Sequence, residues 1–151
     1  MRYTQRQTGH EVTLEPAAPA VASVVLLHGL GADGTDFVPI VDELRLPDAL
    51  PVRFVFPHAP LRPVTVNAGY VMRAWYDIRS FTPEGRADAT GLAQSVGRVN
   101  AYLRNEIARG VAAVVVNNTW PSRVPGRNCH NSSAVKLSTG AIQRTKASRM
   151  R

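Results

Sequence analysis

The sequence has 151 residues, of which 44% are hydrophobic and 19% are charged, as in an ordinary one-domain globular protein. Its one cysteine, Cys129, excludes an internal disulfide framework and favours a reducing, cytoplasmic compartment. The apolar run at residues 17–27 is too short to span a membrane, and the glutamates before it and the proline inside it argue against a secretory signal peptide.

The net charge of +7 is unevenly distributed along the chain. Residues 1–108 contain ten arginines and eleven acids, whereas residues 109–151 contain eight basic residues and no acid. The positive charge therefore belongs to a tail and not to a basic face of the folded part, so nucleic acid is not the expected partner. We divide the chain into a folded part, residues 1–116, and a basic tail, residues 117–151, whose polar composition without periodicity predicts disorder.

The first half of the chain is predicted to contain three strands and one helix. Polar and apolar residues alternate over residues 10–16, which predicts a half-exposed edge strand. Residues 23–27 form a continuous apolar run, typical of a strand covered on both faces in a parallel sheet. After a glycine-containing loop, we expect Thr35 to cap a helix that ends at Leu46-Pro47. Residues 52–56 predict the next strand.

The second half is predicted to contain a loop, a long helix and a final strand. Residues 57–87 are rich in proline, glycine and arginine and predict a long ordered loop. Asp88 begins a helix with apolar side chains on one face, and Gly110 is suited to end it. The apolar stripe consists of Leu92, Val96, Val99, Leu103 and Ile107, and Arg98, Arg104 and Glu106 lie mostly off it. Residues 111–116 predict a buried strand, so the order of elements indicates an α/β fold with right-handed crossovers.

Three segments carry a resemblance to a known family: VVLLHGLGADGTDF (residues 24–37), FPHAPLRPVTVN (56–67) and MRAWYDI (72–78). In this order, followed by the long helix, they resemble the α/β-hydrolase family of phospholipases, small carboxylesterases and acyl-protein thioesterases. The likeness covers about residues 20–110, roughly the N-terminal half of such an enzyme. It implies an incomplete α/β-hydrolase fold with a mostly parallel sheet and flanking helices. It also implies a small-molecule ester or thioester substrate, and neither a metal nor another cofactor.

The loop His28-Gly29-Leu30-Gly31 resembles the family's oxyanion loop. Such enzymes bind the tetrahedral oxyanion with two backbone N–H groups, one from this loop and one from the residue after the nucleophile. By the resemblance, the Leu30 N–H would be the first donor and would also contact substrate. His28 would shape the loop and would not be the general base. The alternative is an ordinary strand-to-helix turn that contains two glycines.

The segment Trp75-Tyr76-Asp77 resembles a family segment that lines the acyl-binding side of the site. Trp75 is therefore a candidate substrate-binding residue. The alternative is that the two aromatic side chains only pack the loop onto the sheet. The residues themselves do not decide between these interpretations.

The residues that would complete a hydrolase site are missing from the sequence. In the family's pattern the strand at residues 111–116 leads into a G-x-S-x-G turn, but this sequence contains no G-x-S-x-G. The nearest segment, residues 93–97, lies inside the predicted helix, so we expect Ser95 at the helix surface and not as a nucleophile. No aspartate follows the strand, and the only histidine after it, His130, is adjacent in sequence to Cys129. We therefore expect negligible hydrolysis by this chain alone.

Three hypotheses remain for the whole chain. The first is a carboxylesterase truncated or frameshifted shortly after Ala113, in which an unpaired sheet edge would favour self-association. The second is a non-enzymatic scaffold whose basic tail binds nucleic acid or another anionic surface. The third is complementation, in which a separate C-terminal half supplies the catalytic residues.

Overall fold

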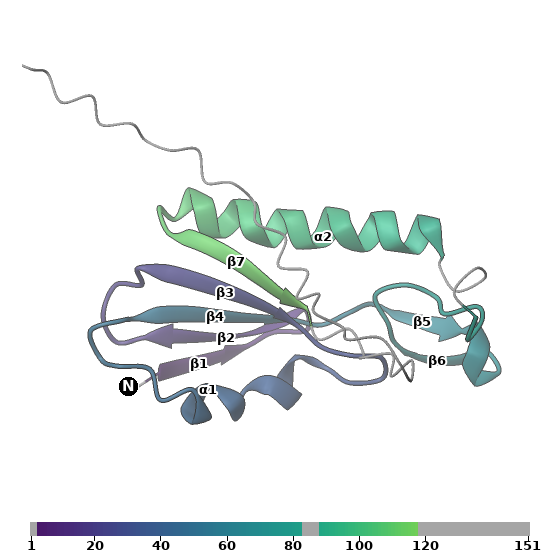
Figure 1. Ribbon diagram of the computed structural model, residues 1–151, viewed down its shortest axis with the longest axis horizontal. Coiled ribbons are helices and arrows are strands. Elements are labelled where there is room, and N and C mark those ends of the chain that lie inside the picture. The colour runs from purple at the N-terminus through teal and green to yellow at the C-terminus, as the bar shows by residue number, and fades with distance from the viewer. Residues whose placement is uncertain (1–2, 83–87, 118–151) are drawn as a thin grey trace, which may run out of the picture.

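The structure is a computed structural model that describes residues 3–82 and 88–117. It contains seven strands and four helical segments in these ranges (Figure 1). The strands are β1 (Tyr3–Gln7), β2 (Glu11–Pro16), β3 (Ala22–Leu27), β4 (Val52–Pro57), β5 (Leu61–Val64), β6 (Tyr70–Arg73) and β7 (Ala112–Asn117). The α-helices are α1 (Ile40–Glu43) and α2 (Ala89–Ala108), and the 3-10 helices are η1 (Gly34–Phe37) and η2 (Thr65–Asn67).

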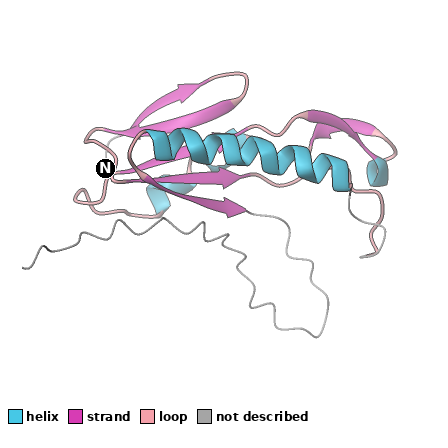
Figure 2. Cartoon of the chain, turned by 90° about the horizontal axis from the view of Figure 1, so that it is seen from above, coloured by secondary structure: helices cyan, strands magenta, loops and turns pink. Residues whose placement is uncertain are grey.

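Five strands form one sheet in the order β1-β2-β4-β3-β7. The pairs β1–β2 and β2–β4 are antiparallel, and the pairs β3–β4 and β3–β7 are parallel, so the sheet is mixed. Helix α2 runs lengthwise along the strands (Figure 2). Leu103 of α2 belongs to the core on one face of the sheet, and Val41 of α1 belongs to the core on the other face. The predicted α/β class is confirmed.

The strand over residues 10–16 is present, but its predicted edge position is wrong. Strand β2 pairs with β1 on one side and with β4 on the other, and most of its residues are buried. Strand β1 occupies the edge instead, with four of its five residues exposed. An exposed, polar edge strand has almost no apolar pattern, which is why the sequence did not predict β1.

The predicted helix after the glycine loop is replaced by two short segments, η1 and α1. The N-cap of η1 is Asp33 and not Thr35, because the Asp33 carboxylate accepts hydrogen bonds from the Thr35 amide (2.7 Å) and hydroxyl (2.5 Å). Asp36 completes a capping box by accepting from the Asp33 amide. Arg45, with a φ of 46°, follows the end of α1.

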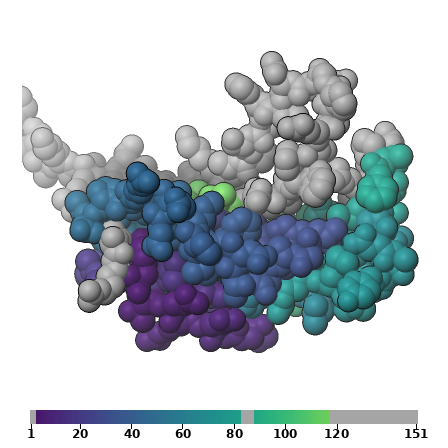
Figure 3. Space-filling view, turned by 90° about the horizontal axis from the view of Figure 1, so that it is seen from below, coloured from purple at the N-terminus to yellow at the C-terminus, as the bar shows by residue number. Residues whose placement is uncertain are grey.

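The predicted long loop over residues 57–87 contains a β-hairpin. Strands β5 and β6 pair antiparallel as a separate two-stranded sheet, with η2 between them. The hairpin forms one end of the molecule, away from β1 and β2 (Figure 3). The proline and arginine residues that favoured a loop lie partly within these short strands.

Helix α2 has the predicted extent, with Asp88 as its N-cap and Gly110 after its C-cap at a φ of 83°. Its orientation differs from the prediction. Of the predicted apolar stripe, Leu103 is buried, whereas Leu92, Val96 and Ile107 are exposed, and the other buried residues of α2 are Gly91, Ser95 and Glu106. The prediction that Ser95 lies at the helix surface is therefore wrong, because Ser95 and Glu106 face the core beside Leu103 and hydrogen-bond there to partners from other elements.

The predicted disorder of the basic tail lies outside the described residues, as do Cys129 and His130. Strand β7 is present as predicted and extends through Asn117. None of the helices in residues 3–82 and 88–117 has the length and apolar character needed to cross a membrane.

Candidate functional site

The candidate site begins at the loop that leaves the carboxyl end of β3. Gly31 has a φ of 76°, a conformation that glycine adopts without strain, and its N–H donates to the Arg73 carbonyl (2.9 Å). The Ala32 N–H turns back to the Gly29 carbonyl (3.4 Å). No residue in the described part of the chain accepts a hydrogen bond from the Leu30 N–H, and Leu30 is 42% exposed. The loop therefore holds the amides of Gly31 and Ala32, whereas that of Leu30 has no acceptor in this part of the chain.

His28 is fully buried, and both of its ring nitrogens are engaged. Its Nε2 accepts a hydrogen bond from the Ala59 N–H (2.9 Å), so Nδ1 carries the proton and donates to the Gly29 carbonyl (2.7 Å). Burial lowers the pKa of His28 below its ordinary value of 6.5. A neutral ring with no free nitrogen cannot accept a proton from a nucleophile, which supports the expectation that His28 shapes the loop and is not the base.

Trp75 connects the glycine loop to helix α2. Its indole N–H donates to the His28 carbonyl (2.9 Å), and its ring packs against the His28 ring at a centroid distance of 5.4 Å. The Trp75 carbonyl accepts a hydrogen bond from the Ser95 hydroxyl of α2. Only 9% of Trp75 is exposed, so most of the indole packs in the core and positions the loop. Its predicted contact with substrate stays a prediction.

Two further hydrogen bonds connect to the segment that follows β4. The Gly34 N–H donates to His58 Nδ1 (3.0 Å), and a Cβ atom at Gly34 would collide with the Phe56 carbonyl, so this close approach requires glycine. Arg73 Nη1 donates to the Ala59 carbonyl (2.9 Å). The segment that follows β4 is therefore held by both the glycine loop and β6.

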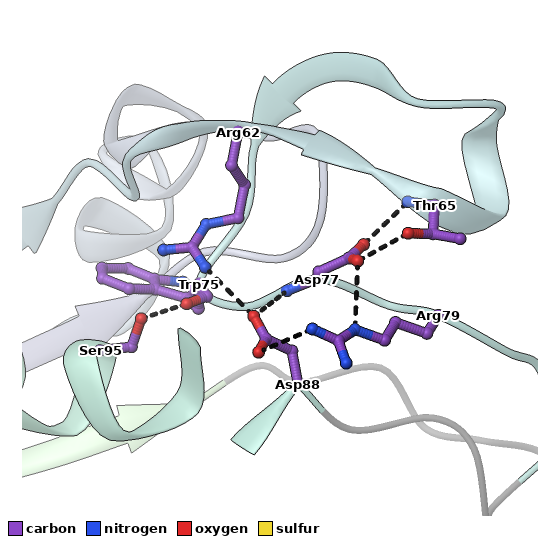
Figure 4. Close-up of polar contacts among 7 residues, drawn as sticks. All are labelled: Arg62, Thr65, Trp75, Asp77, Arg79, Asp88 and Ser95. Carbon is purple, nitrogen blue, oxygen red and sulfur yellow. Dashed lines mark hydrogen bonds and ion pairs between the residues drawn. The ribbon is translucent and has the colours of Figure 1, made fainter. Parts of the chain in front are cut away.

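A polar network connects the β5–β6 hairpin to the segment that carries Trp75 (Figure 4). The Asp77 carboxylate accepts hydrogen bonds from the Thr65 amide (2.8 Å) and hydroxyl (2.6 Å). These two bonds, the hydroxyl first, lower the pKa of Asp77 below its usual value. Both carboxylate oxygens of Asp77 are thus engaged, and the ionised group orders the chain beside Trp75.

Asp88 at the start of α2 joins the same network (Figure 4). Its carboxylate accepts from Arg79 Nη2 (3.3 Å) and from the Asp77 N–H (3.4 Å), and it forms an ion pair with Arg62 Nη1 of β5 (3.7 Å). The Gly91 amide is the main cause that lowers the pKa of Asp88, with the Asp77 amide and the two arginines adding to it. The hairpin and the helix N-terminus are therefore tied to one carboxylate.

No serine in residues 3–82 and 88–117 is paired with a histidine. Ser23 is fully buried and donates to Glu106 (2.6 Å), Ser80 bonds to Thr82, and Ser95 donates to Trp75. Among the same residues, no three His, Cys, Asp or Glu side chains are grouped as metal ligands. What the described chain does present is an ordered loop in which the Leu30 N–H has no acceptor among the described residues.

Sequence comparison identifies the family. The profile of the Phospholipase/Carboxylesterase family matches residues 8–119. The chain belongs to this family. Within the phospholipase/carboxylesterase family, the acyl-protein thioesterase 1 of Yarrowia lipolytica is 34% identical over 89% of this chain and 57% of its own length. The acyl-protein thioesterase 1 of Schizosaccharomyces pombe is 35% identical over 68% of this chain and 45% of its own length.

Solved structures of similar proteins agree with the family assignment. The crystal structure of Zea mays acyl-protein thioesterase 2 superposes with a TM-score of 0.63 at 29% identity, covering 73% of this chain and 46% of that one. The crystal structure of Arabidopsis thaliana SOBER1 superposes with a TM-score of 0.59 at 31% identity, covering 64% and 48%. The chain thus spans about half the length of these phospholipase/carboxylesterase relatives.

The Yarrowia lipolytica match also bears on the tail. Because 89% of the chain is more than the residues up to Asn117, this match extends into residues 118–151. The predicted divergence near residue 113 is therefore not a complete loss of similarity to the family.

Proposed function

We propose that this chain forms the oxyanion-binding half of an acyl ester or thioester hydrolase. The observation that carries the proposal is the Leu30 N–H, which has no acceptor among the described residues although the next two amides, those of Gly31 and Ala32, are hydrogen-bonded. In a hydrolase of this kind, such an amide donates to the oxygen that becomes negatively charged when the substrate carbonyl is attacked. The names of the acyl-protein thioesterase relatives favour a thioester on an acylated protein as the substrate class.

The residues around Leu30 supply rigidity. The loop is anchored through Gly31 to Arg73 and through His28 to Ala59 and Trp75, so the donor needs little reorganisation when charge develops. The neutral His28 ring contributes no positive charge of its own beside the site. By the family resemblance, Trp75 borders the acyl-binding side.

The same chain is proposed to be catalytically incomplete by itself. Its sequence has no G-x-S-x-G, and the second oxyanion donor of this family follows the nucleophile in that motif. Loss of the nucleophile from a serine hydrolase costs a factor of about 10⁶ in turnover. With a single cysteine and no disulfide framework, the proposed compartment is the cytoplasm.

A nuclear magnetic resonance titration with an alkylphosphonate, a stable anionic mimic of the tetrahedral oxyanion, tests the donor. We expect the Leu30 amide resonance to move downfield and saturate, because its N–H is available to the anion. The Gly31 amide is the internal control, since its N–H is already bonded to Arg73. A Leu30 amide that stays in place at saturating phosphonate contradicts the assignment.

A further inference from the structure

The glycine loop, residues 28–34, is held at both ends by two successive residues that follow β4. At the beginning of the loop, His28 Nε2 accepts a hydrogen bond from the Ala59 N–H (2.9 Å). At the end of the loop, the Gly34 N–H donates to His58 Nδ1 (3.0 Å). Leu30 lies between these two attachment points. The loop therefore closes on the segment after β4 through one imidazole from each side.

The Gly34 N–H depends on an acceptor from outside its own helix. Gly34 is buried at the start of η1, where the first amides have no partner within the helix. The carboxylate of the N-cap, Asp33, is bonded to the amide and the hydroxyl of Thr35. Among the described residues, His58 Nδ1 is thus the acceptor that satisfies this buried amide.

The position of His58 allows this bond to fix the end of the loop. The His58 N–H donates to the His10 carbonyl (2.7 Å), which anchors His58 to the segment before β2. Gly34 approaches β4 so closely that a Cβ atom there would collide with the Phe56 carbonyl. A ring nitrogen that accepts a hydrogen bond carries no proton, so the proton of the His58 ring is on Nε2. The bond therefore requires one defined tautomer of His58.

We propose that His58 is a positioning residue for the Leu30 N–H. By accepting from Gly34 it holds the end of the glycine loop against β4, while the beginning and the middle of the loop have their own hydrogen bonds. Loss of the attachment at the end lets the loop and η1 move away from β4. The proposal rests on the proposed function, because a displaced donor stabilises an oxyanion less well than a donor already in place.

Two substitutions of similar size separate the hydrogen-bond acceptor of His58 from its ring. His58→Asn keeps an oxygen near the position of Nδ1 that accepts from Gly34, whereas His58→Leu has no acceptor. In His58→Leu we expect hydrogen exchange of the Gly34 amide to be about tenfold faster, which corresponds to the loss of one hydrogen bond. The Leu30 amide resonance should also shift, without any ligand present. In His58→Asn both quantities should return to their wild-type values.

Butylphosphonate, an anionic mimic of the oxyanion, then measures the effect on the donor. Nuclear magnetic resonance titration should show about tenfold weaker binding to His58→Leu and wild-type binding to His58→Asn. His10→Leu removes an exposed imidazole and is the control, which should change neither the binding nor the two amides. Long-range proton–nitrogen correlation spectra of the wild-type protein should place the His58 proton on Nε2.

A His58 proton on Nδ1 overturns the proposal, as does a wild-type Leu30 resonance or a wild-type butylphosphonate affinity in His58→Leu. Equal changes in His58→Asn and His58→Leu also overturn it, because the acceptor would then not be the cause. If His58→Leu does not fold, the wild-type tautomer and the Leu30 resonance of His58→Asn decide between support and refutation. A wild-type protein that does not bind butylphosphonate contradicts the proposed function. The exchange and resonance measurements test His58 without ligand, so the two failures are distinguishable.

Discussion

Glu106 lies on the buried side of α2 and bonds to two strands of the sheet. The fully buried Ser23 hydroxyl of β3 donates to it (2.6 Å), and Arg53 Nε of β4 donates to its other oxygen (3.1 Å). Arg53 also forms an ion pair with Glu15 of β2. This one carboxylate therefore fixes the position of α2 relative to the strands.

Replacement of Glu106 by alanine is expected to lower the free energy of unfolding by about 3 kcal/mol. The substitution leaves the buried Ser23 hydroxyl without its acceptor and removes one of the two carboxylates that pair with the nearly buried Arg53, whose remaining partner is Glu15. Urea unfolding at neutral pH measures the loss. Glu43→Ala on the exposed side of α1 is the matched control and should change the value by less than about 0.5 kcal/mol. Similar losses in both variants would contradict the role of Glu106.

The stability of the protein is expected to depend on pH through His28. Since burial lowers the His28 pKa in the folded state, the unfolded chain takes up a proton below pH 6.5 that the folded chain refuses. The His28 contribution is therefore complete above about pH 6.5 and is lost as the pH falls toward the folded-state pKa, by up to about 1.4 kcal/mol per pH unit. Urea unfolding between pH 7.5 and 5 measures this slope.

His28→Asn is expected to flatten the slope, because an amide keeps a donor near the position of Nδ1 but does not titrate. His10→Asn, at an exposed position, is the control and should retain it. A slope that survives in His28→Asn would assign the pH dependence to another group.

These side chains also show what sequence patterns miss at the scale of single residues. The sequence predicted an exposed Ser95 and placed Glu106 off the buried stripe, yet both are buried on α2. Helical periodicity locates the core through apolar side chains. It does not detect a polar side chain whose partner comes from a strand far away in the sequence, as Ser23 is for Glu106.

At the scale of elements, the link between α2 and the glycine loop passes through Trp75. Ser95→Ala removes the donor to the buried Trp75 carbonyl, and we expect a loss of about 1–3 kcal/mol of unfolding free energy. Because the Trp75 indole holds the His28 carbonyl, the Leu30 amide resonance should also shift in this variant.

Ser80→Ala is the control for that prediction, since Ser80 is only half-buried and, among the described residues, bonds only within its own turn. A Ser95→Ala protein with wild-type stability and an unchanged Leu30 resonance would contradict the link.

Elements with a strong apolar signal could be predicted from the sequence. Strands β3, β4 and β7 and the extent of α2 agree with the structure, and the three motifs identified the family. Strand β1 and the β5–β6 hairpin could not be predicted, because their residues are mostly polar or exposed and their strands are only four or five residues long. The Leu30 loop was found through the resemblance, while its anchoring by Arg73 and Ala59 required the structure.

At the scale of the whole molecule, the chain alone is expected to resist covalent labelling by a fluorophosphonate probe. Its three described serines are hydrogen-bonded to groups other than histidine, so none is activated as a nucleophile. Intact-mass spectrometry after incubation with the probe measures the result. The Yarrowia lipolytica acyl-protein thioesterase 1 serves as the positive control, and stoichiometric labelling of any serine in this chain would contradict the prediction.

Strand β1 is polar, so the two edges of the five-stranded sheet, β1 and β7, differ in character. Thr4, Gln5, Arg6 and Gln7 are exposed along the outer side of the sheet, where charged and polar groups discourage a further strand from adding. Among the described strands, the sheet can therefore take a further strand at β7 but not at β1. A strand that paired with β7 would complete the sheet, because β1 would not extend the assembly into a fibre.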